Sequence, residues 1–301
     1  MALDGVKVKS DTMYQAGERT AHSRRGAGRL ITTTICYTFL IILCLTTLFP
    51  FFWMISSSFK PETEIIFFKL LPIEPTLANY VRVLTQYPFL RWYCNSIVVT
   101  VITVLSNLLL GSMAAYALAK FRFKGRDLFF LFILSTLMVP SEMLIIPWYA
   151  GASALNIDNS YLGVVFPGLV GAFSVFLLRQ AILTVPNDLM DAARVDGMSE
   201  FGIFFRIVIP LISGSLIALG LLMALTTWND YLWPLIITRD VDMYTLQVGI
   251  TYAAQTDIDE YGAKWTITMA STTIACVPML LLIVAAQKHF VKGIALTGLK
   301  G

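Results

Sequence analysis

The sequence predicts an all-α membrane protein that crosses the bilayer six times. Of its 301 residues, 57% are hydrophobic and 14% are charged, whereas a soluble domain is roughly 45–50% apolar and about 25% charged. The mean hydropathy of +0.73 is correspondingly high. The chain also contains six apolar runs, each near the roughly 20 residues that a helix needs to cross a bilayer. The first run is too long for a signal peptide and lacks a cleavage site.

These apolar runs define one membrane domain over residues 30–290, between polar tails at 1–29 and 291–301. Pro140 and Pro147 interrupt the third run, and four prolines exclude a long helix from 60–91. We expect a short polar turn at 150–159 and an acidic loop at 239–264. The six predicted spans are 30–55, 94–119, 127–149, 160–182, 211–238 and 265–287.

The basic residues predict the orientation of the chain. Six spans place both termini on one side of the membrane, and 16 of the 22 Lys and Arg residues lie on that side. Cytoplasmic loops carry the excess of Lys and Arg. Both termini and the polar stretch 186–210 are therefore expected in the cytoplasm. The acidic loop, with Asp257 and Asp259, is expected outside.

The sequence offers no residues for catalysis. It has no Gly-Lys dipeptide, so the phosphate-binding loop GxxxxGK[ST] is absent. The four cysteines form no CxxC pair, and two isolated histidines predict no metal site. A net charge of +3 is too small to indicate nucleic acid. We expect no catalytic, metal or cofactor residues in this chain, so a partner must supply any energy.

Ionisable residues are scarce inside the predicted spans. An ion-coupled carrier usually needs such residues, so this alternative function is disfavoured. Glu142 either faces a water-filled path or marks the outer end of the third span. Asp230, in TWNDYLWPL, either anchors the chain at the interface or serves transport. Glu142 and the polar Asn107 of the second span are the candidates for a translocation path.

The polar stretch 186–210 predicts two short helices joined by a turn. Asn187 is a good N-cap for a helix that ends at Val195. Gly197 can adopt a positive φ and end that helix, and Ser199 can cap the second one. The apolar face expected for the second helix comprises Phe201, Phe204, Phe205 and Val208.

The charge of this stretch favours a protein partner over lipid. A helix that lies on a membrane usually carries many basic residues, and acidic groups are unfavourable next to anionic lipid. The Ala192-Ala193 pair would let a partner approach closely. Four acidic residues face only two basic ones here: Asp188, Asp191, Asp196 and Glu200 against Arg194 and Arg206.

At these residues the chain resembles a known family. DAARVDG at 191–197, followed by FxxIVIPL at 204–211, is similar to the EAA loop of the permease subunits of binding-protein-dependent ABC importers. Asp191 stands where that family has Glu. Other stretches resemble the carbohydrate branch and its MalG-like subunits, so that the resemblance covers most of residues 35–301. They are SFKPETEI at 58–65, NSIVVT at 95–100, WNDYLWPLII at 228–237, MYTLQVGI at 243–250 and QKHFVKGIALTGLKG at 287–301.

The resemblance implies a type I importer permease fold in the bacterial cytoplasmic membrane. It implies a second, homologous permease subunit, two cytoplasmic ATPase subunits that bind ATP and Mg, and an extracytoplasmic solute-binding protein. In MalG-like subunits the loop between the last two spans reaches into the binding protein, and the main sugar pocket lies in the partner permease. A glycerol phosphodiester or a polyol remains an alternative to a sugar.

The resemblance also implies two sets of contact residues. The loop that would contact the binding protein includes Thr251, Gln255, Asp257 and Asp259. The residues that would contact an ATPase are Asp188, Asp191, Ala192, Ala193, Arg194, Asp196, Gly197 and Phe201.

Overall fold

The structure is a computed structural model that describes residues 32–65, 69–256, 258–259, 262–263 and 265–297. The chain divides into two units after Ser56. The first unit contains most of a 27-residue helix, Thr32–Ser58, whose apolar side chains are largely exposed. This helix confirms the first predicted span. The expected N-terminal tail, 1–29, lies outside the described residues.

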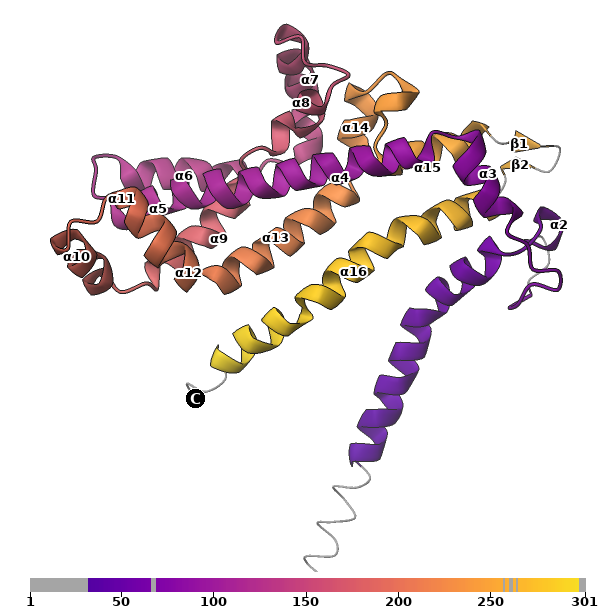
Figure 1. Ribbon diagram of the computed structural model, residues 1–301, viewed down its shortest axis with the longest axis horizontal. Coiled ribbons are helices and arrows are strands. Elements are labelled where there is room, and N and C mark those ends of the chain that lie inside the picture. Colours follow the sequence, from indigo (N-terminus) through magenta and orange to yellow (C-terminus); the bar gives the residue numbers. More distant parts are fainter. Residues whose placement is uncertain (1–31, 66–68, 257, 260–261, 264, 298–301) are drawn as a thin grey trace, which may run out of the picture. The chain divides into compact units, whose positions relative to one another are not determined.

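Three helices of the described chain are long and apolar enough to cross a membrane. Besides Thr32–Ser58, they are the continuous helix Phe89–Lys120 and the helical stretch Trp265–Gln287. Figure 1 shows the last two in the second unit. The structure labels their parts α4 (Phe89–Ser106), the π-helix η1 (Asn107–Gly111), α5 (Ser112–Lys120) and α16 (Trp265–Thr297). No helix end marks residue 291, where the sequence predicts the C-terminal tail to begin.

The third predicted span is broken into two helices that bend by 96°. The helix α6 ends at Thr136, and Pro140 precedes the 3-10 turn η2. Pro147 does not interrupt the chain, because it lies in the first turn of α7, where a missing N–H costs nothing. The bounds are α6 Arg126–Thr136, η2 Ser141–Leu144 and α7 Ile145–Ala154.

Two further pairs of helices are bent, by 50° and by 79°. Counting each bent pair as one span gives six spans by length and composition, as the sequence predicts. The first pair is α8 (Tyr161–Val165) with the 3-10 turn η3 (Phe166–Gly168), followed by α9 (Ala172–Leu183). The second is α11 (Glu200–Ile203), the π-helix η4 (Phe204–Val208) and α12 (Ile209–Leu211), followed by α13 (Ser213–Trp228).

Two sequence predictions are wrong in this region. The fifth span is not continuous to residue 238, because α13 ends at Trp228 and a separate helix follows. The stretch 239–264 is not only a loop, because 11 of its residues fold into a helix that packs against α4 and α16. The elements are α14 (Leu232–Ile237), the 3-10 turn η5 (Val241–Met243), α15 (Leu246–Thr256) and the antiparallel pair β1 (Ile258–Asp259) and β2 (Gly262–Ala263).

Side chains of α4 hold the stretch before α15 in place. The buried Trp92 indole donates to the Val241 carbonyl at 2.7 Å. The Asn95 amide donates to two carbonyls of the same stretch, both at 2.9 Å, and accepts a hydroxyl proton from Tyr161. The short helices α2 (Glu62–Ile65) and α3 (Ala78–Gln86) lie near this end of α4.

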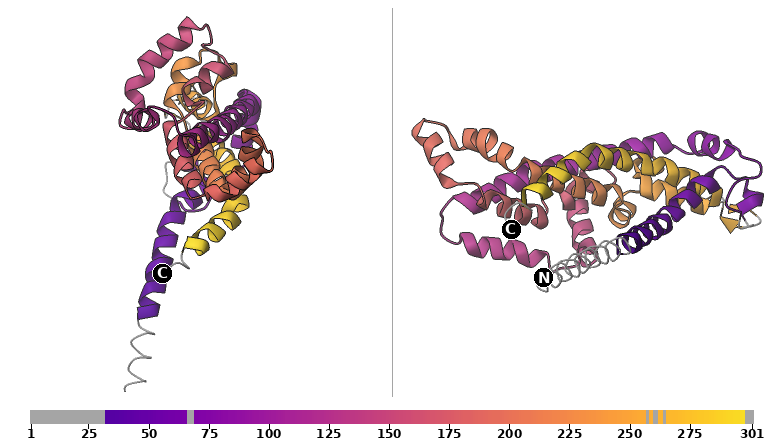
Figure 2. Two further views of the ribbon diagram at one scale, coloured as in Figure 1. Left: turned by 90° about the vertical axis from the view of Figure 1, so that its left-hand side faces the viewer. Right: turned by 90° about the horizontal axis from the view of Figure 1, so that it is seen from below.

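The second unit has three buried apolar clusters. One lies among α5, α9, α10 (Asn187–Val195) and α13, and includes Met190 and Leu178. A second lies among α3, α4, α15 and α16 around Trp92. The third joins α4, α7, α8 and α14. In Figures 1 and 2, α10 and the β1–β2 pair lie at opposite ends of this unit.

The contact between α4 and α15 gives a test of the fold. A Cβ added at Gly249 would collide with the ring of Trp92. We expect Gly249→Ala to lower the stability of the solubilised protein by about 1–3 kcal/mol through overpacking. The control is Gly214→Ala in α13, where a Cβ meets nothing within 4 Å. Thermal unfolding followed by size-exclusion chromatography measures both, and equal midpoints would contradict this packing.

Candidate functional site

The EAA-like loop, residues 186–210, begins with the helix α10 (Asn187–Val195). Asn187 is the first helical residue and does not cap the helix with its side chain, contrary to the sequence prediction. Its Oδ1 instead accepts from Lys120 Nζ at 3.0 Å, and the same ammonium donates to the Val185 carbonyl at 2.6 Å. Lys120 ends α5, so the start of α10 is held by the end of a long helix.

The turn after α10 is a Schellman motif. The Met198 N–H donates to the Ala193 carbonyl at 2.9 Å, and the Gly197 N–H donates to the Arg194 carbonyl at 3.0 Å. These two bonds define the motif. Gly197 has a φ of 81°, as the sequence predicts. A side chain there would strain the backbone without a clash, because no atom lies within 4 Å of the Cβ position.

Arg194 joins the two helices across this turn. Its guanidinium donates to Asp191 at 2.6 Å and to the two carboxylate oxygens of Glu200 at 2.7 and 3.3 Å. Glu200 also accepts from the Tyr116 hydroxyl at 2.7 Å. The hydrogen bonds with Glu200 are the main reason that the pKa of Arg194 lies above its usual range, and those with Asp191 add to it. Ser199 caps α11 by accepting from the Gly202 N–H, as predicted.

The helix α10 presents two different faces. Met190 and Ala193 are buried in the first cluster, with exposures of 1% and 6%. The opposite face is exposed and mixed in character: Ala192 and Val195 lie in line with Asp188, and the exposed Leu189 flanks them. The two alanines therefore have different roles: Ala193 packs inward and Ala192 faces outward. Asp191 and Asp196 are exposed at the edge of the outer face.

The second helix does not have the single apolar face that its sequence predicts. Phe204 and Val208 are buried, whereas Phe201 and Phe205 are exposed. The chain forms the π-helix η4 over Phe204–Val208. A π-helix turns less per residue than an α-helix, so the four apolar residues are divided between two faces.

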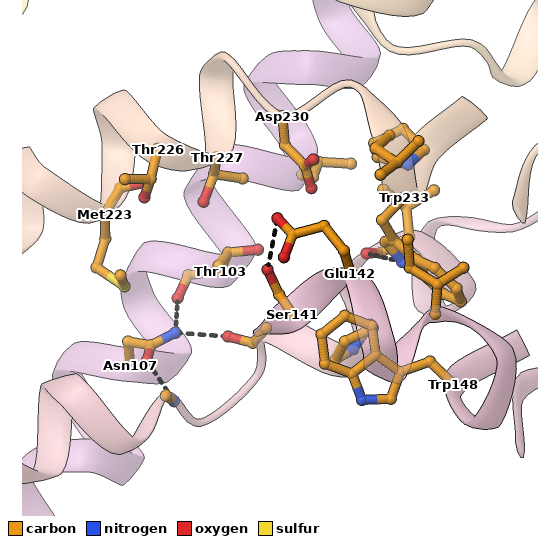
Figure 3. Close-up of a pocket in the computed structure, with 18 residues that line it drawn as sticks. Thr103, Asn107, Ser141, Glu142, Trp148, Met223, Thr226, Thr227, Asp230 and Trp233 are labelled. Carbon is orange, nitrogen blue, oxygen red and sulfur yellow. Dashed lines mark hydrogen bonds between the residues drawn. The ribbon is translucent and has the colours of Figure 1, made fainter. Parts of the chain in front are cut away.

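A cavity of about 360 Å³ lies in the second unit, beside the breaks of two of the bent spans, those before η2 and before α9 (Figure 3). It is named the polar cavity for the polar side chains in its otherwise largely apolar lining. Its walls come from α4, η1, η2, α7, the α8–η3 segment, α13 and α14. Non-helical backbone at membrane depth is tolerated where it is buried in protein or lines a water-filled cavity. The breaks and the cavity are therefore parts of one feature.

Asn107 lies in this cavity wall and is 1% exposed. Its amide nitrogen donates to the carbonyls of Thr103 and Gly168 at 2.9 and 2.6 Å. Its Oδ1 accepts from the Gly171 N–H at 2.8 Å and from the Ser174 hydroxyl at 2.7 Å. These bonds satisfy the backbone on both sides of the break between η3 and α9.

The structure brings Glu142 to the same cavity as Asn107. Asp230 lies there too, and Figure 3 shows both carboxylates pointing into one space. Ser141 donates to Glu142 at 3.3 Å. Sequence reasoning missed the rest of this wall, including Thr103, Trp148 and Trp233. The signal available in the sequence was Pro140 beside Ser141 and Pro234 beside Trp233, because a proline next to a polar or aromatic residue can mark a helix break that lines a cavity.

The residues expected to contact a binding protein lie at the far end of the unit. Thr251 and Gln255 are on α15, where the Thr251 hydroxyl donates to the Gln247 carbonyl at 3.0 Å. Asp257 lies outside the described residues, and only the backbone of Asp259 is described, in β1. Within the described chain, no three His, Cys, Asp or Glu side chains are grouped to hold a metal ion.

Comparison with known proteins identifies the family. Residues 107–296, more than half of the chain, match the family of binding-protein-dependent transport system inner membrane components. This chain belongs to that family. It is thus a membrane permease subunit of an ABC transporter that works with a solute-binding protein, and it is not an enzyme.

Three relatives illustrate the range of the family. The arabinooligosaccharides transport permease AraQ of Halalkalibacterium halodurans is 38% identical, over 84% of this chain and 91% of the relative. The sn-glycerol-3-phosphate transport permease UgpE of Brucella suis is 31% identical, over 89% and 98%. A chain of a bacterial ABC transporter involved in import of the acidic polysaccharide alginate superposes with a TM-score of 0.78. It is 26% identical, over 86% of this chain and 96% of that one.

The Arg194 network predicts how firmly the turn is held. In Arg194→Gln, Glu200 loses its charged partner, and we expect the amides of 196–198 to exchange with solvent roughly fivefold faster, as for an exposed ion-pair network. Arg122→Gln makes the same charge change in an exposed loop outside the network. Hydrogen exchange with mass spectrometry compares the two variants. Unchanged exchange in Arg194→Gln would show that the Schellman turn holds without the ion pairs.

Proposed function

We propose that this chain is a permease of an ATP-driven importer for a sugar or oligosaccharide, coupled to two ATPase subunits through the EAA-like loop. The proposed coupling to the ATPase is supported chiefly by the exposure of the outer face of α10. That face is exposed and carries large apolar side chains, with Val195 88% and Leu189 47% exposed, while the inner face is fixed in the core. An exposed apolar surface with a polar rim is typical of a protein interface.

The docking surface consists of Leu189, Ala192 and Val195 with Asp188 among them, and Asp191 lies at its edge. Each ATPase subunit binds ATP and Mg and receives the α10 of one permease. Because Ala192 is small, the partner surface can approach the helix closely. Phe201, which is 66% exposed, extends the apolar surface across the turn.

The opposite end of the second unit would meet the binding protein. Thr251 and Gln255 on α15, with Asp257 and Asp259 beyond it, form the expected contact loop. In this proposal the two partners bind on opposite sides of the bacterial cytoplasmic membrane, and both termini of the chain are cytoplasmic. A second, homologous permease subunit would complete the translocation path.

The sugar assignment rests on the similarity to the arabinooligosaccharide permease. The glycerol-3-phosphate permease is the relative that favours the alternative of a non-sugar solute. The complete importer, reconstituted with its binding protein, distinguishes them. We expect its ATPase activity to rise with loaded binding protein and a neutral oligosaccharide. A rise with sn-glycerol 3-phosphate instead would overturn the sugar assignment.

Two adjacent alanines test the coupling surface. We expect Ala192→Asp to keep normal expression and thermal stability but to lose most of the stimulated ATPase activity and uptake, because it places a charge in the docking surface. Ala193→Asp should instead lower stability, since an unpaired carboxylate would be buried, at a cost of several kcal/mol. From the sequence alone, Ala192 and Ala193 were both expected to contact the ATPase. Wild-type coupling in Ala192→Asp would remove α10 from the ATPase interface.

A further inference from the structure

The polar cavity is built for a ligand of moderate size. Its volume of about 360 Å³ falls within the roughly 300–1,000 Å³ that small-molecule sites occupy. It adjoins the interrupted helices, and such interruptions mark the substrate sites of many transporters. Its lining combines apolar rings, hydroxyls and two carboxylates, which is a surface suited to a sugar.

One hydroxyl in the wall lacks an internal partner. Thr103 is 6% exposed, and none of the described residues forms a hydrogen bond with its Oγ1. Figure 3 shows this hydroxyl directed toward the space that holds the Glu142 carboxylate. The hydroxyl oxygen is not enclosed by protein, so it can form a hydrogen bond with a molecule in the cavity. A solute hydroxyl bound in the cavity would satisfy it.

Aromatic rings form another side of the cavity. Trp148 packs edge-on against Trp233, with ring centroids 5.9 Å apart. The Trp233 indole N–H is used internally, on the carbonyls of Gly163 and Val164. This pairing fixes Trp233, which in turn supports Trp148. A ring held in this way can pack against the C–H groups of a sugar.

The charge of the cavity discriminates among solutes. Glu142 and Asp230 are acidic, and the lining contributed by the described residues includes no Lys, Arg or His. Carboxylates accept hydrogen bonds from sugar hydroxyls. They repel the carboxylates of uronic acids and the phosphate of phosphorylated solutes, because like charges brought close together are unfavourable.

We propose that this subunit itself binds solute in the cavity, and that Glu142 and Asp230 select neutral oligosaccharides over uronate- or phosphate-bearing solutes. The proposal rests on the proposed import function and specifies its substrate class. One relative is named for a neutral oligosaccharide, and another for an anionic phosphate ester. The structural neighbour is involved in importing an acidic polysaccharide. The acidic residues of the cavity make this chain similar to the relative whose name includes a neutral oligosaccharide.

The test measures binding to the complete importer in nanodiscs, without the binding protein. The neutral probes are arabinotriose, maltotriose and lactose, and the acidic probe is trigalacturonate. The readout is tryptophan fluorescence, with Trp148→Phe to show that the signal arises at the cavity. We expect a saturable response to at least one neutral probe, and affinity for trigalacturonate at least about tenfold lower.

Two isosteric variants then test the charge. In Glu142→Gln and in Asp230→Asn, we expect affinity for trigalacturonate to rise about tenfold, because one repelling charge is removed while the shape is kept. The neutral response should change much less, which also shows that the variants are folded. The control is Glu74→Gln, which removes an exposed carboxylate outside the cavity.

Three results would overturn the proposal. They are equal affinity of the wild type for neutral and acidic probes, no response to any neutral probe, and a response that survives unchanged in Trp148→Phe. Each is separable from a failure of the import function. If sugar-loaded binding protein still stimulates ATPase activity and uptake, only the cavity assignment is lost. If that stimulation is absent, the proposed function fails first.

Discussion

The interrupted backbone of the bent spans is the constraint on which this membrane unit depends. A chain in the bilayer must satisfy every peptide group internally, because lipid offers no hydrogen bonds. Asn107 meets this demand at one break, where three of the four hydrogen bonds of its side-chain amide link η1 to the η3–α9 junction. A break that is held in this way leaves room beside it, and the polar cavity occupies that room.

The EAA-like loop solves a different problem, which is to keep a surface helix rigid outside the apolar core. A nine-residue helix is marginal by itself in water. Here Lys120 holds its start, the Schellman turn and Arg194 hold its end, and Met190 and Ala193 fix its inner face. A helix fixed at three places can transmit a push, whereas a loosely attached one would absorb it.

Local signals predicted the parts of this molecule that depend on neighbours in sequence. Gly197 followed from the Asp-Gly pair, the Ser199 cap from its spacing, and the six spans from apolar length. Asn187 was misjudged because its partner, Lys120, lies 67 residues away. The helix α15 was missed because its contacts with α4 and α16 are also long-range, and its sequence carries no strong period of its own.

The cavity shows the same limit in another form. Glu142 and Asn107 stand out in sequence as polar residues in apolar runs, but nothing in that pattern brings them to one place. The sequence around Asp230 favours an interface anchor, since tryptophans flank it. Its position in the cavity depends on the end of α13 at Trp228, and hence on a break that the apolar pattern of 211–238 conceals.

The first buried cluster connects the two features physically. It begins at Met190 and Ala193 on α10 and continues through Leu178 on α9 to Leu219 on α13. Met223, one turn further along α13, packs against this cluster and also lines the cavity. Close-packed interiors deform little, so a displacement of α10 reaches the cavity wall through contiguous side chains. The bends at the breaks are where the helices can change angle, because the regular hydrogen-bond ladder is already interrupted there. Force applied at one end of the unit can thus alter the shape of the cavity without unfolding a helix.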